Sequence, residues 1–82
     1  MAITTTTTWQ TLPNNELFES ERKEWLTQAV SAGKTASVDV SFDEDTPLIK
    51  QRTWTNEDAA NEWKTFIEAL ATKYGTSASV TW

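Results

Sequence analysis

The stretch RTWTNEDAANEWKTFIEALATKYG, residues 52–75, carries the most regular pattern in the chain. Its apolar side chains recur at spacings of three and four, which places them on one face of a helix. These side chains are Ala59, Ala60, Trp63, Phe66, Ile67, Leu70, Ala71 and Tyr74. The pattern predicts an amphipathic helix with Trp63 in the core.

The ends of this helix are also marked. Thr55 is a good N-cap, and Asp58 follows three residues later as an imperfect capping box. Gly75 is predicted to end the helix, because glycine accepts the left-handed conformation after the last turn. Trp54 precedes the predicted cap and is expected to pack against Ala59 as a strand-to-helix staple.

A second helix is predicted over ELFESERKEWLTQAVSAG, residues 16–33, and Gly33 is expected to end it. Residues 19–24 contain no apolar side chain, so the alternative is a helix that starts at Ser20 after a separate ELF segment. One continuous helix is preferred. Its predicted apolar stripe consists of Leu17, Phe18, Trp25, Ala29 and Val30, and Leu26 lies beside it.

Four segments have the character of strands: residues 3–9, 36–43, 48–54 and 77–82. The second alternates cleanly, with Ala36, Val38, Val40 and Phe42 on one face. The third has mixed alternation, since Leu48 and Trp54 share a face with Lys50 and Arg52. Its inner face therefore stays unassigned.

The resulting order is β-α-β-β-α-β in a single domain, residues 1–82. It predicts an α+β fold, a two-layer sandwich with an antiparallel sheet and two helices on one face, in the ferredoxin-like arrangement. The first strand is central in that arrangement, yet ITTTTTW is mostly threonine. We therefore expect residues 1–8 to be frayed, to lie at an edge, or to join a partner's sheet.

Composition excludes several kinds of chemistry. The 82 residues include no His and no Cys, which removes histidine bases, thiolate nucleophiles and metal sites built on His or Cys. The two glycines are far apart and are better explained as helix ends, so no glycine-rich phosphate loop is predicted. Seven basic against twelve acidic residues give a net charge of −5, which opposes binding to nucleic acid or anionic membrane. We predict no cofactor, and no small-molecule ligand is identifiable.

The start of the chain has no signal-peptide pattern, and no apolar run is long enough for a membrane span. A cytoplasmic location is expected. The acidic residues within 39–45 offer carboxylate oxygens of the kind that a hard cation binds. Their spacing does not match a calcium loop, and a solvated strand face explains them better. No metal-binding residue and no catalytic residue is predicted.

Five tryptophans in so short a chain must supply much of the core or form a patch for a partner. Trp9 and Trp82 are near the chain ends, where burial is least certain. The predicted candidate interface consists of these two residues with Ile3 and Trp54, since aromatic residues are enriched at interface hot spots.

The pattern R-T-W-T-N-E-D-A-A-N-E-W-x-x-F-I, residues 52–67, with the strand that follows, resembles small uncharacterised proteins of T4-like marine cyanophages. The resemblance covers mainly residues 52–82. It implies a viral accessory or virion-associated protein, located in the host cytoplasm or the virion, and it assigns no functional residues. The predicted topology is also similar to dimeric α+β barrel proteins, which include cofactor-free monooxygenases.

The leading hypothesis is a non-enzymatic binding or virion-associated module that acts through protein–protein contacts as a homo-oligomer. The alternatives are a cofactor-free enzyme of the dimeric α+β barrel kind with a pocket between sheet and helices, or an acidic inhibitor of a host protein. The inhibitor would present the acidic face of residues 39–45 to a basic partner.

Overall fold

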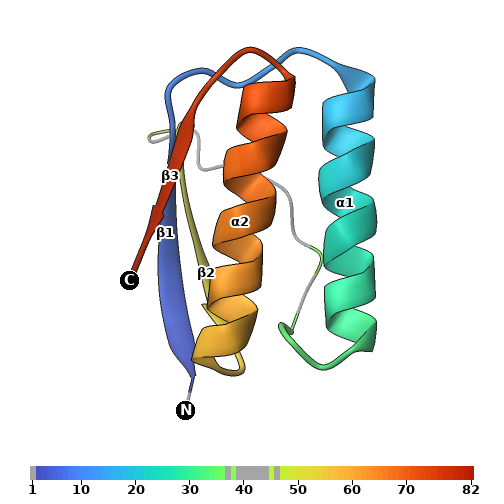
Figure 1. Ribbon diagram of the computed structural model, residues 1–82, viewed down its shortest axis with the longest axis vertical. Coiled ribbons are helices and arrows are strands. Elements are labelled where there is room, and N and C mark those ends of the chain that lie inside the picture. The colour runs from blue at the N-terminus through green and yellow to red at the C-terminus, as the bar shows by residue number, and fades with distance from the viewer. Residues whose placement is uncertain (1, 37, 39–44, 46) are drawn as a thin grey trace.

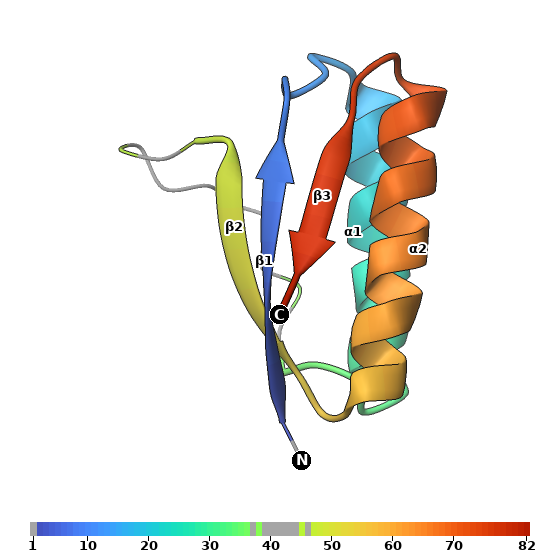
Figure 2. The ribbon, with the colours of Figure 1, turned by 60° about the vertical axis from the view of Figure 1, so that its left-hand side comes forward.

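In the described part of the chain, three strands and two helices form two layers, which Figures 1 and 2 show from two sides. The structure is a computed structural model that describes residues 2–36, 38, 45 and 47–82. Both helices cover the same face of the sheet (Figure 2). In chain order the elements are β1 (Ile3–Trp9), α1 (Glu16–Ser31), β2 (Ile49–Trp54), α2 (Glu57–Lys73) and β3 (Ala78–Thr81).

The described strands form an antiparallel sheet in the order β2-β1-β3. Ile3 pairs with Trp54 at one end of the β1–β2 ladder, and Trp9 pairs with Ala78 at one end of the β1–β3 ladder. This is the predicted α+β, ferredoxin-like layout. The prediction that the threonine-rich strand is frayed or lies at an edge is wrong, because β1 is bonded on both sides.

Threonine is tolerated in this central strand because its buried hydroxyls have partners. Thr5 and Thr7 point toward the helices and are almost completely buried. The hydroxyl of Thr5 accepts a hydrogen bond from the indole N–H of Trp54 at 3.0 Å, and that of Thr7 accepts one from Trp63 at 3.2 Å. A buried hydroxyl is costly only when it lacks a partner, so the polar strand can occupy the centre of the sheet.

The inner face of β2, which the sequence left open, is the one that carries Arg52 and Trp54. Ile49 lies on the opposite, exposed face. The guanidinium of Arg52 is 5.8 Å from the ring centre of Trp63, so an aromatic surface covers its charged group. The predicted strand 36–43 lies outside the described residues except at Ala36 and Val38.

Helix α1 is continuous from Glu16, so the alternative start at Ser20 is wrong. The side chain of Asn15 caps it by accepting from the backbone N–H of Leu17 at 2.8 Å. Leu17 was expected in the apolar stripe, but it is 66% exposed. Arg22 is buried instead, with its guanidinium carbon 5.2 Å from the ring centre of Phe18. The methylene stem of Arg22 and its contact with Phe18 thus cover the core where α1 has no apolar side chains.

Helix α2 is capped by Asn56, whose side-chain oxygen accepts from the N–H of Ala59 at 2.9 Å. The predicted cap, Thr55, instead donates its hydroxyl proton to the carbonyl of Gly33 at 2.6 Å. Trp54 therefore lies one position further from the helix than a staple requires, although it is fully buried.

Both helices end at the predicted glycines. Gly33 and Gly75 have φ angles of 73° and 76°, a region that side chains with a Cβ rarely adopt. After α2, the N–H groups of Gly75 and Thr76 bond to the carbonyls of Thr72 and Ala71, which is the Schellman pattern. The core between the layers is Trp9, Phe18, Leu26, Ala29, Trp54, Ala59, Ala60, Trp63, Ile67, Leu70, Ala71 and Val80.

Candidate binding surface on the helix face

The four residues of the predicted interface do not form one surface. Trp9 is 2% exposed and Trp54 is 0% exposed, so both belong to the core and offer almost no surface to a partner. Ile3 is partly buried and packs against that core. Only Trp82, which is 48% exposed, offers a large apolar surface to solvent.

A different pair of aromatic residues reaches the surface, between the two helices. Trp25 of α1 stacks on Phe66 of α2, with ring centres 4.8 Å apart and an angle of 11° between the ring planes. Both residues are partly buried. Trp25 also contacts the buried Trp54 edge-on at 5.9 Å and Trp63 at 5.5 Å. The aromatic contacts therefore run from the buried Trp54 and Trp63 to the partly exposed Trp25 and Phe66 on the outer face of the helix layer.

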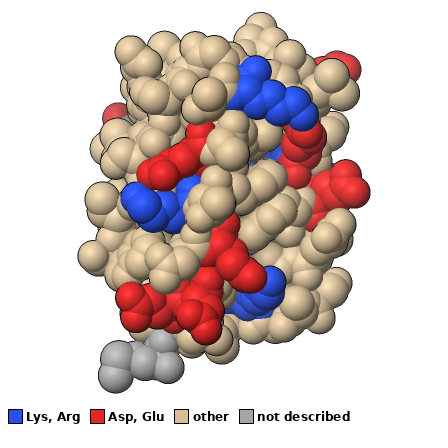
Figure 3. Space-filling model, in the orientation of Figure 1, with Lys and Arg blue, Asp and Glu red and all other residues tan. Residues whose placement is uncertain are grey.

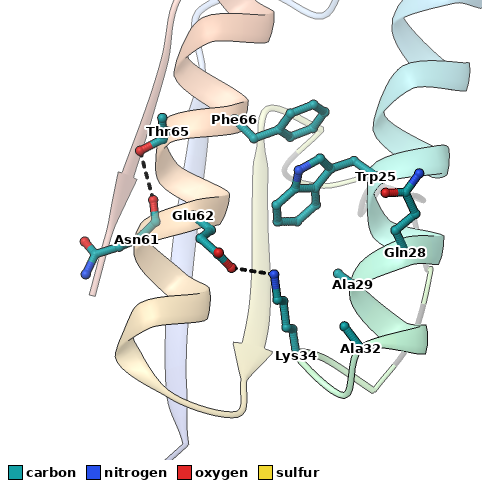
Figure 4. A pocket seen from close by; sticks show the side chains of 9 residues that line it. All are labelled: Trp25, Gln28, Ala29, Ala32, Lys34, Asn61, Glu62, Thr65 and Phe66. Carbon is teal, nitrogen blue, oxygen red and sulfur yellow. Dashed lines mark hydrogen bonds and ion pairs between the residues drawn. The ribbon is translucent and has the colours of Figure 1, made fainter.

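A hollow of about 600 Å³ lies beside the stack. Figure 4 shows its lining side chains, which come from α1, the turn after α1, and α2. The alanines on α1 are small and leave space between the helices, while the aromatic rings close one end. The lining residues are Trp25, Gln28, Ala29, Ala32, Lys34, Asn61, Glu62, Thr65 and Phe66.

An ion pair closes the other end of this hollow. The ammonium of Lys34 lies 2.7 Å from a carboxylate oxygen of Glu62, and the pair joins the turn after α1 to α2 (Figure 4). Both side chains are substantially exposed, so the attraction between them is weak and can be exchanged for another partner at small cost. On α2, the hydroxyl of Thr65 donates to the backbone carbonyl of Asn61 at 3.1 Å.

Charges on the helix face alternate in sign, and Figure 3 shows basic groups lying beside acidic ones. Lys64 pairs with Glu68 at 3.0 Å within α2, and Lys73 pairs with Glu21 of α1 at 2.6 Å. This face is therefore unlike the broad basic surface that nucleic acid requires.

Glu21 has two partners that join the helices near the end of α2. Lys73 donates to one of its carboxylate oxygens, and the hydroxyl of Tyr74 donates a short hydrogen bond to the other. The hydrogen bond from Lys73 and then that from Tyr74 lower the pKa of the Glu21 carboxyl from its ordinary value of 4.5. The same carboxylate raises the pKa of Lys73 and of Tyr74.

The charged groups of the hollow, Lys34 and Glu62, are bonded to each other and partly solvated. Among the described residues, no group of three or more acidic side chains is placed to hold a metal ion. Of the acidic run considered as a cation site, only Asp45 lies within the described residues.

Sequence reasoning missed this surface because it assigned Trp25 and Phe66 to two separate helix stripes. The pattern does place both rings on inward faces, but it does not show that the rings meet each other rather than the sheet. One signal was present: Ala29 and Ala32 follow Trp25 on the same side of α1 and are too small to fill the space between two helices.

The chain matches no protein-family model, and it matches no curated protein and no solved structure closely enough to show a relationship. Within the part of the chain that the structure describes, neither helix has both the length and the apolar character to cross a bilayer.

Proposed function

We propose that this protein is a non-enzymatic binding module that acts through protein–protein contacts, and that it associates with a second copy of itself through the helix face. The observation that carries the proposal is the partly exposed Trp25–Phe66 stack beside an open hollow. Tryptophan dominates binding energy at interfaces when it is held rigidly and loses its remaining water. Contacts with Trp54 and Trp63 hold the ring of Trp25 in place before any partner arrives.

The charges beside the stack favour a second copy as the partner. Lys34 and Glu62 are adjacent and opposite in charge. A twofold axis through the helix face would bring Lys34 to the partner's Glu62 and Glu62 to the partner's Lys34. A surface with this pattern is complementary to itself, as a symmetric dimer requires. The exposed intrachain pair on each copy is weak, so the exchange of these two pairs for two interchain pairs costs little.

Charge reversal gives a sharp test that does not disturb the core. In Lys34→Glu the helix face carries two anions, and in Glu62→Lys it carries two cations, so each variant repels its own copies. We expect sedimentation velocity at about 100 µM, a concentration suited to weak association, to show a wild-type dimer and two monomeric variants. An equimolar mixture of the two variants should associate again, because each presents the charges that the other lacks.

Glu16→Lys is the matched control, since it makes the same change at an exposed site at the start of α1. It should leave the dimer intact. A wild-type protein that is strictly monomeric under these conditions would contradict the proposal. So would a mixture of variants that associates no better than either variant alone.

The resemblance of residues 52–67 to small cyanophage proteins suggests a phage setting for this module, in the host cytoplasm or the virion. Mass spectrometry of purified virions tests the virion-associated form of the proposal, and gene neighbourhood tests the phage origin.

The enzyme hypothesis required a pocket between sheet and helices, whereas the described hollow lies between the helices on their outer side. It is therefore not favoured. The inhibitor hypothesis stays a prediction, because most of residues 39–45 lie outside the described part of the chain.

A further inference from the structure

Strand β3 has one edge bonded to β1 and one edge that no described strand covers. The N–H of Gln10 donates to the carbonyl of Ser77 at 2.8 Å and continues the β1–β3 ladder. Because backbone groups alternate in direction along an antiparallel strand, those of Ser79 and Thr81 also face β1, while those of Ala78 and Val80 face away. The outward carbonyl of Val80 is thus at the edge where another strand could pair.

A side chain already occupies this position. The ammonium of Lys64, on α2, donates to the carbonyl oxygen of Val80 at 3.1 Å. The same ammonium bonds to the carboxylate of Glu68 at 3.0 Å, one helical turn later. Two acceptors from different elements therefore hold Lys64 over the edge of β3.

We infer that Lys64 closes the β3 edge of the sheet against a second copy of this chain. A strand that paired with this edge would need the Val80 carbonyl as a hydrogen-bond acceptor, and it would have to displace the ammonium that holds it. A charged side chain over a short edge strand is a common way to prevent edge-to-edge pairing. β3 has only four residues, so the loss of one acceptor removes a large share of the possible ladder.

A second copy is the occupant that this edge fits. Two β3 strands related by a twofold axis pair in antiparallel fashion, and each supplies the donors and acceptors that the other needs. The pairing would extend the three-stranded sheet across the axis. Forming such a dimer would displace the Lys64 ammonium of both copies.

This inference concerns a different surface from the helix face and does not rest on the proposed function. The test is therefore made in the Lys34→Glu background, which repels helix-face contact whether or not that contact exists in the wild type. Lys64→Ala removes the ammonium, Lys64→Arg retains a charged donor, and Lys23→Ala is the control at an exposed lysine of α1.

We expect Lys64→Ala to strengthen self-association by at least about tenfold, the effect of one hydrogen bond to a charged group. Lys64→Arg and Lys23→Ala should resemble the background protein in sedimentation velocity. Equal association of Lys64→Ala and the background protein would overturn the inference.

The site of contact needs its own measurement. The chain has no cysteine, so Ser79→Cys and Lys23→Cys each provide a single position for a spin label. Pulsed electron paramagnetic resonance on the Lys64→Ala protein should give a short interchain distance for labels at position 79 and a long one at position 23. Long distances at position 79 would place the contact elsewhere and overturn the inference.

Discussion

The indole N–H of Trp54 donates a hydrogen bond of 3.0 Å to the hydroxyl of Thr5, and neither residue is exposed to solvent. The same hydroxyl donates to the backbone carbonyl of Arg52 at 3.3 Å. One threonine thus provides the acceptor for the indole N–H of a buried tryptophan and joins β1 to β2. The relationship explains why a threonine-rich strand is buried in the middle of the sheet.

Thr5→Val should lower the free energy of unfolding by about 1–3 kcal/mol, because valine keeps the shape but leaves a buried indole N–H without an acceptor. Urea unfolding measures the change. Thr4→Val is the control: Thr4 lies on the exposed face, so its replacement should change stability by no more than about 0.5 kcal/mol. Equal effects of the two substitutions would contradict the role given to the buried hydroxyl.

Asn56→Ala should cost about 1 kcal/mol of stability, because it removes the side-chain acceptor for the N–H of Ala59 at the start of α2. The replacement Asn56→Asp should restore most of that stability, since aspartate is an equally good cap and suits the positive end of the helix dipole. Thermal unfolding followed by circular dichroism provides the comparison. A large loss of stability in Asn56→Ala and a small one in Asn56→Asp would identify a capping effect. Equal losses in the two variants would contradict it.

Glu21 should titrate below its ordinary pKa of 4.5, because Lys73 and Tyr74 both donate hydrogen bonds to the charged form of its carboxylate. A carboxyl whose pKa is lower in the folded protein stabilises the fold above its unfolded value, and this contribution disappears as the pH falls through the folded value. Nuclear magnetic resonance of the side-chain carbonyl carbon measures the pKa directly.

Two variants separate the partners of Glu21. Lys73→Met and Tyr74→Phe should each move the pKa of Glu21 upward, toward its ordinary value, and the larger movement is expected for Lys73→Met. Glu24→Gln, at an exposed position on α1, is the control and should leave the titration of Glu21 nearly unchanged. A Glu21 pKa that stays the same in both partner variants would contradict the contact between the helices.

For helix α2, the local sequence pattern was enough to predict the buried face and the end of the helix. Its apolar spacing and its final glycine required no knowledge of the rest of the chain, and the structure confirms both. The start of the helix was missed by one residue, because Thr55 and Asn56 are both good caps. The choice between them depended on a distant group, since the hydroxyl of Thr55 is bonded to the carbonyl of Gly33.

Strand β2 and helix α1 show where pattern reasoning failed. The alternation of β2 is mixed because Arg52 lies on the buried face, and only the packing of the helices on the sheet shows which face that is. In α1, Arg22 is buried although it lies in the stretch without apolar side chains, while Leu17, which was expected in the apolar stripe, is exposed. Long amphipathic side chains can cover a core with their stems, so residue type alone does not decide their burial.

The sequence predicts the residues of the candidate surface but not their contact with one another. Aromatic residues on two helices were evident, but their stacking depends on how far apart the helices pack and how they are rotated. The exposed tryptophan patch expected at Trp9 and Trp82 was assigned by chain position. The fold instead carries Trp9 into the core, while Trp82 is 48% exposed.

The order of the elements, the apolar face of α2 and the glycine ends of both helices follow from local sequence, because each depends on residues within a few positions of one another. Long-range packing places β1 in the centre of the sheet, buries its inward threonines and brings Trp25 to the surface beside Phe66. Each of these results depends on partners far apart in the chain: Thr5 and Trp54 are 49 residues apart. Such contacts are fixed by the packing of the helices on the sheet, which no local pattern contains.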